Sequence, residues 1–169
     1  MVPKGDHAKK GGNMRITVYN TALDSDKHTV LIKESSQNLQ GIECLNNPQN
    51  IVAMFNTVFH ANILAEEYVW VMAMNTKGKL LGIFEISHGG INTSFVAPRE
   101  IFVRLALCGA ASFVLIHNHP SGCTAPSDED SCVTSRVKDA GKLMCIPLLD
   151  HIIIGDDYYS FHENGEIVE

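Results

Sequence analysis

Residues 110–130 read AASFVLIHNHPSGCTAPSDED, an apolar run that ends in two histidines and is followed by a loop and an acidic segment. The run from 110 to 116 is apolar and partly β-branched, which is typical of a buried β-strand. Proline and glycine residues between 120 and 126 break this strand into a loop. From Ser127 onward, apolar residues recur at helical spacing. The pattern therefore predicts a strand, a loop and a helix in this order.

His117 and His119 are predicted to converge on one cation. Alternate residues of a strand share a face, so these two imidazoles point the same way, with Cα atoms roughly 7 Å apart. Asp130 falls in the first turn of the predicted helix, and a loop that folds back brings its carboxylate to the histidines. Three protein ligands leave the fourth tetrahedral position of a zinc ion to water, as in catalytic sites. The sequence thus predicts a zinc site made by His117, His119 and Asp130.

The same residues also fit interpretations without a metal. Ser127 can cap the helix, with Asp130 as the reciprocal partner three residues later. Histidines at the end of a strand are often polar edge residues. We favour zinc because the strand, the paired histidines, the loop, the capped helix and the acid must all coincide for a metal site. Cys123, in the loop, is a weakly supported fourth ligand.

Glu85 is the candidate for the general base that a zinc hydrolase needs. It lies within the apolar run 80–86, and burying an unpaired acid costs on the order of several kcal/mol. Catalysis is one explanation for that cost. The other is an ion pair with a cation such as Arg99 or Arg104, and both explanations remain open at this point.

Two further polar positions have possible supporting roles. Ser127 could donate a hydrogen bond to a carbonyl oxygen that gains charge during attack, while it still caps the helix through its lone pairs. Asp150, beside His151, either orients a ligand imidazole or forms a structural ion pair, and the sequence slightly favours the ion pair.

Length and composition predict one soluble domain. The chain has 169 residues, 45% of them hydrophobic, with a net charge of −6 and a pI near 5.7. We expect a flexible arm over 1–14, rich in lysine and glycine, and a single domain over 15–169. The acidic balance does not support tight non-specific binding to nucleic acid. No apolar stretch is long enough to be a signal peptide core or a membrane span, and five cysteines without C-x-x-C spacing fit reduced thiols, so we expect a cytoplasmic protein.

The order of the predicted elements is β-β-α-β-β-α-β-α-β-β. This order predicts an α/β fold in which a mixed β-sheet carries helices on both faces. The first two strands form an edge ribbon. The expected strands are 15–19, 29–34, 66–74, 79–87, 110–116, 145–154 and 158–161, and the expected helices are 48–59, 99–107 and 127–143.

A glutamate, then H-x-H, seven residues and S-x-x-D resembles the motif of JAMM/MPN+ metalloprotease domains. It is matched here by Glu85 and by His117-x-His119-x7-Ser127-x-x-Asp130. Further stretches, 97–102, 117–122, 140–143 and 149–155, look like the RadC branch of that superfamily. The resemblance extends from about Pro48 to Phe161.

The resemblance implies an α/β/α sandwich of the MPN and cytidine-deaminase-like kind. It also implies one zinc ion on His117, His119 and Asp130, Glu85 as general acid and base, and Ser127 stabilising the tetrahedral intermediate. The implied activity is hydrolysis of an amide or isopeptide bond in a protein or peptide substrate. RadC-like proteins are also commonly labelled as DNA repair proteins.

Two departures from the RadC pattern bear on function. Long members carry a helix-hairpin-helix region before this domain, and the first forty-odd residues here are too short and too strand-like for it, so a DNA partner is the weaker expectation. The common Gly-Asp-Pro of the loop is Gly122-Cys123-Thr124 here, which leaves every ligand position intact but can reshape substrate access.

Other function classes compete with the hydrolase. A non-catalytic interaction module could keep the fold and use a metal for stability alone. Base deamination is disfavoured, because the chain lacks H-x-E followed by P-C-x-x-C. The letters His-Asn-His at 117–119 match an HNH nuclease only by coincidence, since that motif is dispersed over a longer unit. The sequence makes no prediction about the oligomeric state.

Overall fold

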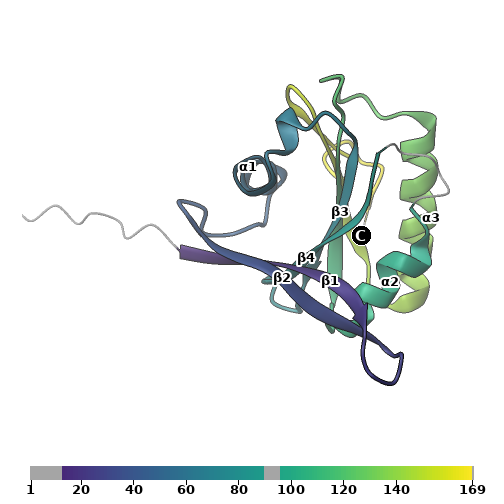
Figure 1. Ribbon diagram of the computed structural model, residues 1–169. Helices are drawn as coiled ribbons and strands as arrows, with labels where there is room; N and C mark the ends of the chain where they lie inside the picture. The colour runs from purple at the N-terminus through teal and green to yellow at the C-terminus, as the bar shows by residue number, and fades with distance from the viewer. Residues whose placement is uncertain (1–12, 90–95, 169) are drawn as a thin grey trace, which may run out of the picture.

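The computed structural model describes residues 13–89 and 96–168. Their strands form one seven-stranded sheet in the order β2-β1-β4-β3-β5-β6-β7. Helix α1 covers one face, and α2 and α3 cover the other (Figure 1). The predicted α/β fold with helices on both faces is confirmed. The elements are β1 (Asn13–Leu23), β2 (Thr29–Gln40), α1 (Pro48–Phe59), the 3-10 helix η1 (Ala61–Ile63), β3 (Tyr68–Met74), β4 (Leu80–His88), α2 (Pro98–Leu107), β5 (Ser112–Asn118), α3 (Asp128–Met144), β6 (Leu148–Ile154) and β7 (Tyr158–Ser160).

Strand β3 is at the centre of the sheet and sets the two faces. It pairs antiparallel with β4 on one side and with β5 on the other, and β5 pairs parallel with β6. All of its residues after Tyr68 are buried. A central strand with both faces covered needs apolar residues throughout, which explains why its sequence shows a continuous apolar run and no alternation.

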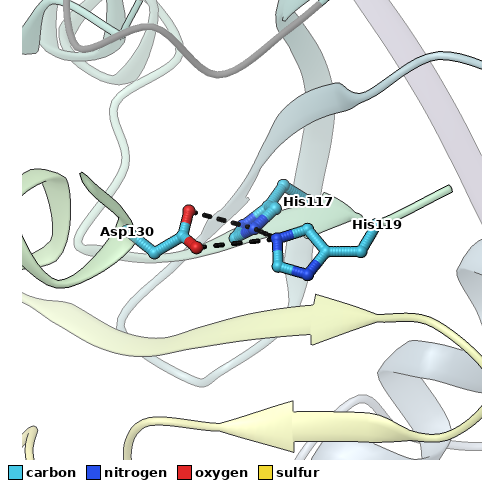
Figure 2. A group of neighbouring side chains, drawn as sticks. All are labelled: His117, His119 and Asp130. Atoms are coloured by element: carbon cyan, nitrogen blue, oxygen red, sulfur yellow. Dashed lines mark hydrogen bonds and ion pairs between the residues drawn. The ribbon is translucent and has the colours of Figure 1, made fainter. Parts of the chain in front are cut away.

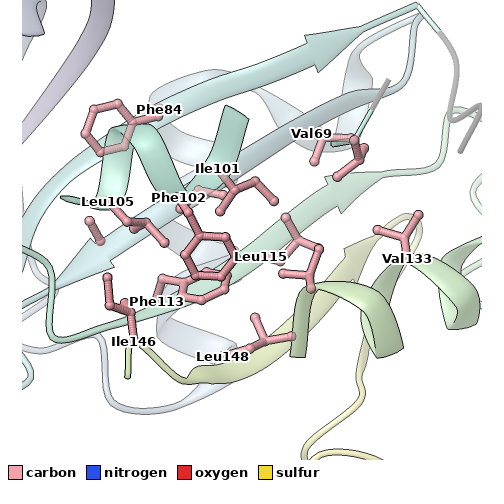
Figure 3. Close-up of a cluster of buried hydrophobic side chains, with 14 of the residues drawn as sticks. Val69, Phe84, Ile101, Phe102, Leu105, Phe113, Leu115, Val133, Ile146 and Leu148 are labelled. Carbon is pink, nitrogen blue, oxygen red and sulfur yellow. The ribbon is translucent and has the colours of Figure 1, made fainter. Parts of the chain in front are cut away.

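Each face of the sheet carries its own hydrophobic cluster. Val69, Val71 and Ala73 of β3 pack towards α2 and α3, and Figure 3 shows much of this cluster, with Phe102 of α2 meeting Phe113 of β5 edge to face at 5.6 Å. Trp70 and Met72 pack on the opposite face, against α1. A side chain can therefore be assigned to the α2/α3 face or to the α1 face from its position in the register.

The β1–β2 hairpin is longer than predicted. Strand β2 is at the edge of the sheet, as expected. Strand β1 pairs with β4 at only two residue pairs, so most of the hairpin extends beyond the other five strands (Figure 1). Strand β1 begins at Asn13, so residues 13 and 14 belong to a strand and not to the predicted arm. The rest of that arm lies outside the described residues.

The starts of two helices confirm the capping predictions. Asn47 precedes Pro48 and accepts a hydrogen bond from the backbone N–H of Asn50 at 2.8 Å. Ser127 caps α3, in which residues 133 and 137 face the core. Among the described residues, no helix is long and apolar enough to cross a membrane.

Candidate metal centre

The structure brings His117, His119 and Asp130 together. His117 is on β5, His119 follows this strand directly, and Asp130 is in the first turn of α3 (Figure 2). The Nε2 atoms of the two histidines are 2.9 Å apart, and the Asp130 oxygens lie 3.2 Å from Nε2 of His117 and 3.5 Å from Nε2 of His119. Two donors on one tetrahedral zinc ion are about 3.3 Å apart, given bond lengths of about 2.0–2.1 Å. These three residues could therefore hold a metal ion.

The other ring nitrogen of each histidine already has a partner. Nδ1 of His119 donates to the carbonyl oxygen of Cys123 at 2.7 Å, and Nδ1 of His117 is 2.8 Å from Nε2 of His151. Metal-binding histidines commonly use their second nitrogen in this way, because it fixes the ring and its tautomer. Cys123 contributes a carbonyl oxygen to this arrangement, and its thiol is not part of the three-residue group.

Asp130 also completes the helix cap. The hydroxyl and the backbone N–H of Ser127 donate to its Oδ2 at 2.6 and 2.8 Å, and its own N–H donates to Oγ of Ser127 at 3.1 Å. The capping box considered above is therefore present, and the same carboxylate still faces both histidines. Asp130 is both the capping-box partner of Ser127 and a candidate ligand, so the two interpretations are compatible.

The charges in the cluster follow from burial and from close contact. Burial lowers the pKa of His117 and keeps this imidazole neutral. The hydrogen bond to Asp130 raises the pKa of His119, although its partial burial opposes this. Burial disfavours the charged form of Asp130, but its contacts with the histidines outweigh this and hold the pKa of the carboxyl well below its usual range. The cluster thus combines an ionised carboxylate with a neutral His117, and His119 takes up a proton most readily.

Glu85 does not face this cluster. In the register it pairs with Trp70, which packs on the α1 face, whereas His117 pairs with Val69, which packs on the α2/α3 face. Its side chain is 43% exposed and lies 2.9 Å from Nδ1 of His88. The expectation that Glu85 lies beside the ligands is corrected, because the end of β4 is open to solvent on the α1 face and does not force an acid there to have a buried partner.

The alternative of an ion pair between Glu85 and an arginine is not realised either. Arg99 and Arg104 both contact Glu100, at 2.8 and 3.3 Å. Both pairs lie within α2, so neither of these arginines is the ion-pair partner of Glu85.

Glu67 is a half-buried acid that borders the cluster, and the sequence pattern did not single it out; the other glutamate of the cavity lining, Glu129, is exposed. A cavity of about 310 Å³ is lined by Glu67, Ser127, His119 and Asp130, among others. Glu67 is half-buried and precedes Val69 by two residues, and its negative charge works to raise the pKa of His117 and His119. The available signal was an acid pair, Glu66-Glu67, directly before a buried strand. A larger cavity of about 1210 Å³ contains none of the cluster residues.

Asn118 fixes the chain on both sides of Glu67. Its Nδ2 donates to the carbonyl oxygen of Glu66 at 3.0 Å, and its Oδ1 accepts from the backbone N–H of Tyr68 at 2.8 Å. Asn118 is only 1% exposed and lies between the two histidines. One side chain on β5 thus holds the segment that carries Glu67 next to the candidate metal ligands.

His151, rather than Asp150, contacts a candidate ligand, His117. The carboxylate of Asp150 accepts from Oγ of Ser160 at 2.6 Å and from the backbone N–H groups of His151 and His162. Burial raises the pKa of Asp150. These contacts connect β6 to β7 and to the turn after it, so Asp150 has a structural role.

The comparison with protein families agrees with this geometry. The family model of the RadC-like JAB domain matches residues 45–166, which include Glu67 and all three residues of the candidate metal site. The chain belongs to the RadC-like JAB family. The resemblance noted from the motif is confirmed at the level of the family and of the fold.

Relatives of this RadC-like JAB domain occur in several bacteria. A UPF0758 protein of Pelobacter propionicus is 36% identical over 138 residues, which are 81% of this chain and 59% of the relative. A UPF0758 protein of Alkaliphilus metalliredigens is 48% identical over 103 residues, 60% of this chain and 44% of the relative. One from Desulfitobacterium hafniense is 41% identical over 122 residues, 72% of this chain and 53% of the relative. The chain spans about half the length of these relatives.

Proposed function

We propose that this RadC-like JAB domain is a zinc-dependent hydrolase that cleaves an amide or isopeptide bond in a protein or peptide substrate. The observation that carries the proposal is the convergence of two imidazole Nε2 atoms and one carboxylate beside a cavity that Glu67 also lines. Because both Nδ1 atoms have other partners, the Nε2 atoms are the ones available to a cation.

The donor set fits zinc. Two neutral imidazole nitrogens and a carboxylate oxygen are common ligands of catalytic zinc. Without a cation, and without a proton on His119, the lone pairs of the two Nε2 atoms would face each other and an ionised carboxylate at about hydrogen-bond distance. A zinc ion held by these residues supplies a Lewis acid that polarises the scissile carbonyl and lowers the pKa of water towards about 7.

Glu67 takes the role of general base in this proposal, in place of Glu85. The water oxygen bonds to the carbonyl carbon, and the Glu67 carboxylate accepts the proton that the water loses. The carbon–nitrogen bond then breaks, and Glu67 returns this proton to the leaving nitrogen, so the glutamate ends as it began. Its half-buried position supports this role, because Glu67 lines the same cavity as His119 and Asp130.

Ser127 donates to the carbonyl oxygen that gains negative charge. Its hydroxyl proton is held by Oδ2 of Asp130 at 2.6 Å, so the hydroxyl must rotate before it can serve the substrate. The backbone N–H of Ser127 keeps its own bond to Oδ2 at 2.8 Å during that rotation. The cap therefore stays intact while the hydroxyl becomes available.

The experiment combines metal analysis with a substrate panel. Freshly purified protein is expected to contain one zinc ion per chain, and peptides and isopeptide-linked substrates are incubated before chelation, after chelation and after zinc is restored. We expect cleavage that is lost and regained with zinc, and that Glu67→Gln abolishes while zinc stays bound. The contrary result is a zinc-loaded protein that cleaves none of the substrates, with a Glu67→Gln variant that matches it in zinc content and in lack of cleavage. That result would identify a non-catalytic interaction module.

A further inference from the structure

A buried chain of hydrogen bonds leads from the backbone of α3 to a candidate metal ligand. Oγ1 of Thr134 lies 2.6 Å from the carbonyl oxygen of Asp130 and 2.6 Å from Nδ1 of His151. Nε2 of His151 lies 2.8 Å from Nδ1 of His117. Thr134 is 4% exposed, and both histidines are 1% exposed, so water does not compete for these bonds.

The direction of each bond follows from the one before it. A carbonyl oxygen only accepts, so the Thr134 hydroxyl donates its one proton to the carbonyl oxygen of Asp130. Towards His151 this hydroxyl can then only accept. His151 must then donate from Nδ1. A neutral imidazole carries one proton, so Nε2 of His151 accepts, and Nδ1 of His117 donates to it.

The reverse direction is disfavoured. With the proton of His151 on Nε2, its Nδ1 lone pair would face the lone pairs of Thr134 at 2.6 Å. A doubly protonated His151 would place a charge among buried groups, against the ring of Phe161, with which it stacks at a centroid distance of 4.8 Å.

We infer that Thr134 and His151 are positioning residues that keep the proton of His117 on Nδ1 and so keep its Nε2 lone pair available to a divalent cation. The inference rests on the metal site of the proposed function. This chain of hydrogen bonds, the relay, starts at the backbone carbonyl of Asp130. Asp130 is therefore connected to the His117 ring in two ways, directly through its carboxylate and indirectly through Thr134 and His151.

Loss of this chain of hydrogen bonds is expected to lower the affinity for zinc. Without it, the proton of His117 can move to Nε2, where it must be displaced before a cation binds. Partners of this kind typically change metal affinity by about 10- to 100-fold.

The test compares Thr134→Val with Thr134→Ser by zinc titration against a chromophoric chelator. We expect the valine variant to bind zinc at least about tenfold more weakly and the serine variant, which keeps the hydroxyl, to remain within about threefold of the wild type. Equal affinity of the valine variant and the wild type would overturn the inference. Thermal unfolding of the metal-free proteins checks that both variants are folded.

Nitrogen-15 NMR of the histidine rings in metal-free wild-type protein keeps the inference testable if the valine variant does not fold. The expected spectrum shows His117 and His151 both protonated at Nδ1 at neutral pH, whereas His117 protonated at Nε2 overturns the relay. Absence of zinc binding by the wild type would refute the proposed function. The NMR measurement is made without metal, so it tests the tautomer of His117 independently of that outcome.

Discussion

Asn118 accepts a hydrogen bond of 2.8 Å from the backbone N–H of Tyr68 and thereby connects β5 to the start of β3. The amide group of the same side chain donates to the carbonyl oxygen of Glu66 at 3.0 Å. Both peptide groups that flank Glu67 are thus held by the residue between the two candidate histidine ligands. The distance between the proposed base and the proposed metal is fixed by a single buried amide.

Asn118→Ala is expected to lower kcat at least about tenfold while zinc affinity changes little, because a small displacement of a catalytic group is costly. It also removes the side-chain partner of two partly buried backbone groups, which costs up to about 1–3 kcal/mol each in unfolding free energy. Asn118→Asp keeps the acceptor for Tyr68 but loses the donor to the carbonyl oxygen of Glu66, so its comparison with the alanine variant separates the two bonds. Steady-state kinetics measure kcat, and metal analysis measures the zinc content. An unchanged kcat in the alanine variant would show that the hydrogen bonds of Asn118 do not position Glu67.

Glu67→Gln and Glu85→Gln form a pair that distinguishes the two acids. Loss of a general base typically lowers kcat by about 10²–10⁴-fold, so we expect this loss for Glu67→Gln. Glu85→Gln is expected to stay within about twofold of the wild type, because Glu85 is on the α1 face with His88. Zinc content is measured in both variants as the control. The opposite result, an active Glu67→Gln and an inactive Glu85→Gln, would return the role to Glu85.

Zinc affinity is expected to fall with decreasing pH. The pKa of His119 is raised above its ordinary value of 6.5 by Asp130, so its proton competes with the cation below this raised pKa. One competing proton reduces the affinity about tenfold for each pH unit in that range. Zinc titrations at several pH values measure the slope, and His119→Ala, whose affinity is lower overall, should show a shallower slope. A pH-independent affinity in the wild type would contradict this.

The stability of the metal-free protein is expected to depend on pH in two opposite ways. The raised pKa of His119 contributes stability that is fully present below about 6.5 and is lost as the pH rises through the raised value. The lowered pKa of Asp130 contributes stability that is present above about 3.8 and is lost as the pH falls. Chemical unfolding of wild-type protein and of His119→Ala across this range checks both signs. A variant with the same pH profile as the wild type would show that His119 contributes nothing.

Gly155→Ala is expected to destabilise the loop that carries His119. A Cβ atom at Gly155 would clash with the carbonyl oxygen of Gly122, which also accepts from the backbone N–H of Asp156 at 2.9 Å. Crowding of this kind costs about 1–3 kcal/mol. Thermal unfolding measures the loss, and Cys123→Ala, an exposed position of the same loop, is the control and should unfold like the wild type.

The sequence predicted what local patterns encode. The order of strands and helices follows from the apolar patterns along the chain. The cap at Ser127 and the convergence of His117, His119 and Asp130 follow from the spacing around one loop. The acid that lies beside the cluster could not be identified in this way. Strand β4 pairs with β3 through register shifts after Val69 and Ala73, so the face on which Glu85 lies depends on long-range pairing that no local pattern records.

Glu67 was missed for a related reason. The prediction began the strand at Glu66, whereas β3 begins at Tyr68, and this difference turns the two acids from strand residues into part of the connection before the strand. The length of the β1–β2 hairpin was also underestimated, because its residues are largely exposed and lack the apolar alternation that identifies a half-buried strand.

Asp130 belongs to α3, whereas His117 and His119 belong to the sheet and its loop, and this division has a mechanical consequence. A zinc ion held by these three residues would fasten the first turn of the helix to the C-terminal end of β5. Fraying of that turn and release of the ion then become a single event. Amide hydrogens at the start of α3 should therefore exchange with solvent at a rate that depends on zinc concentration, while those at its C-terminal end keep their own rate.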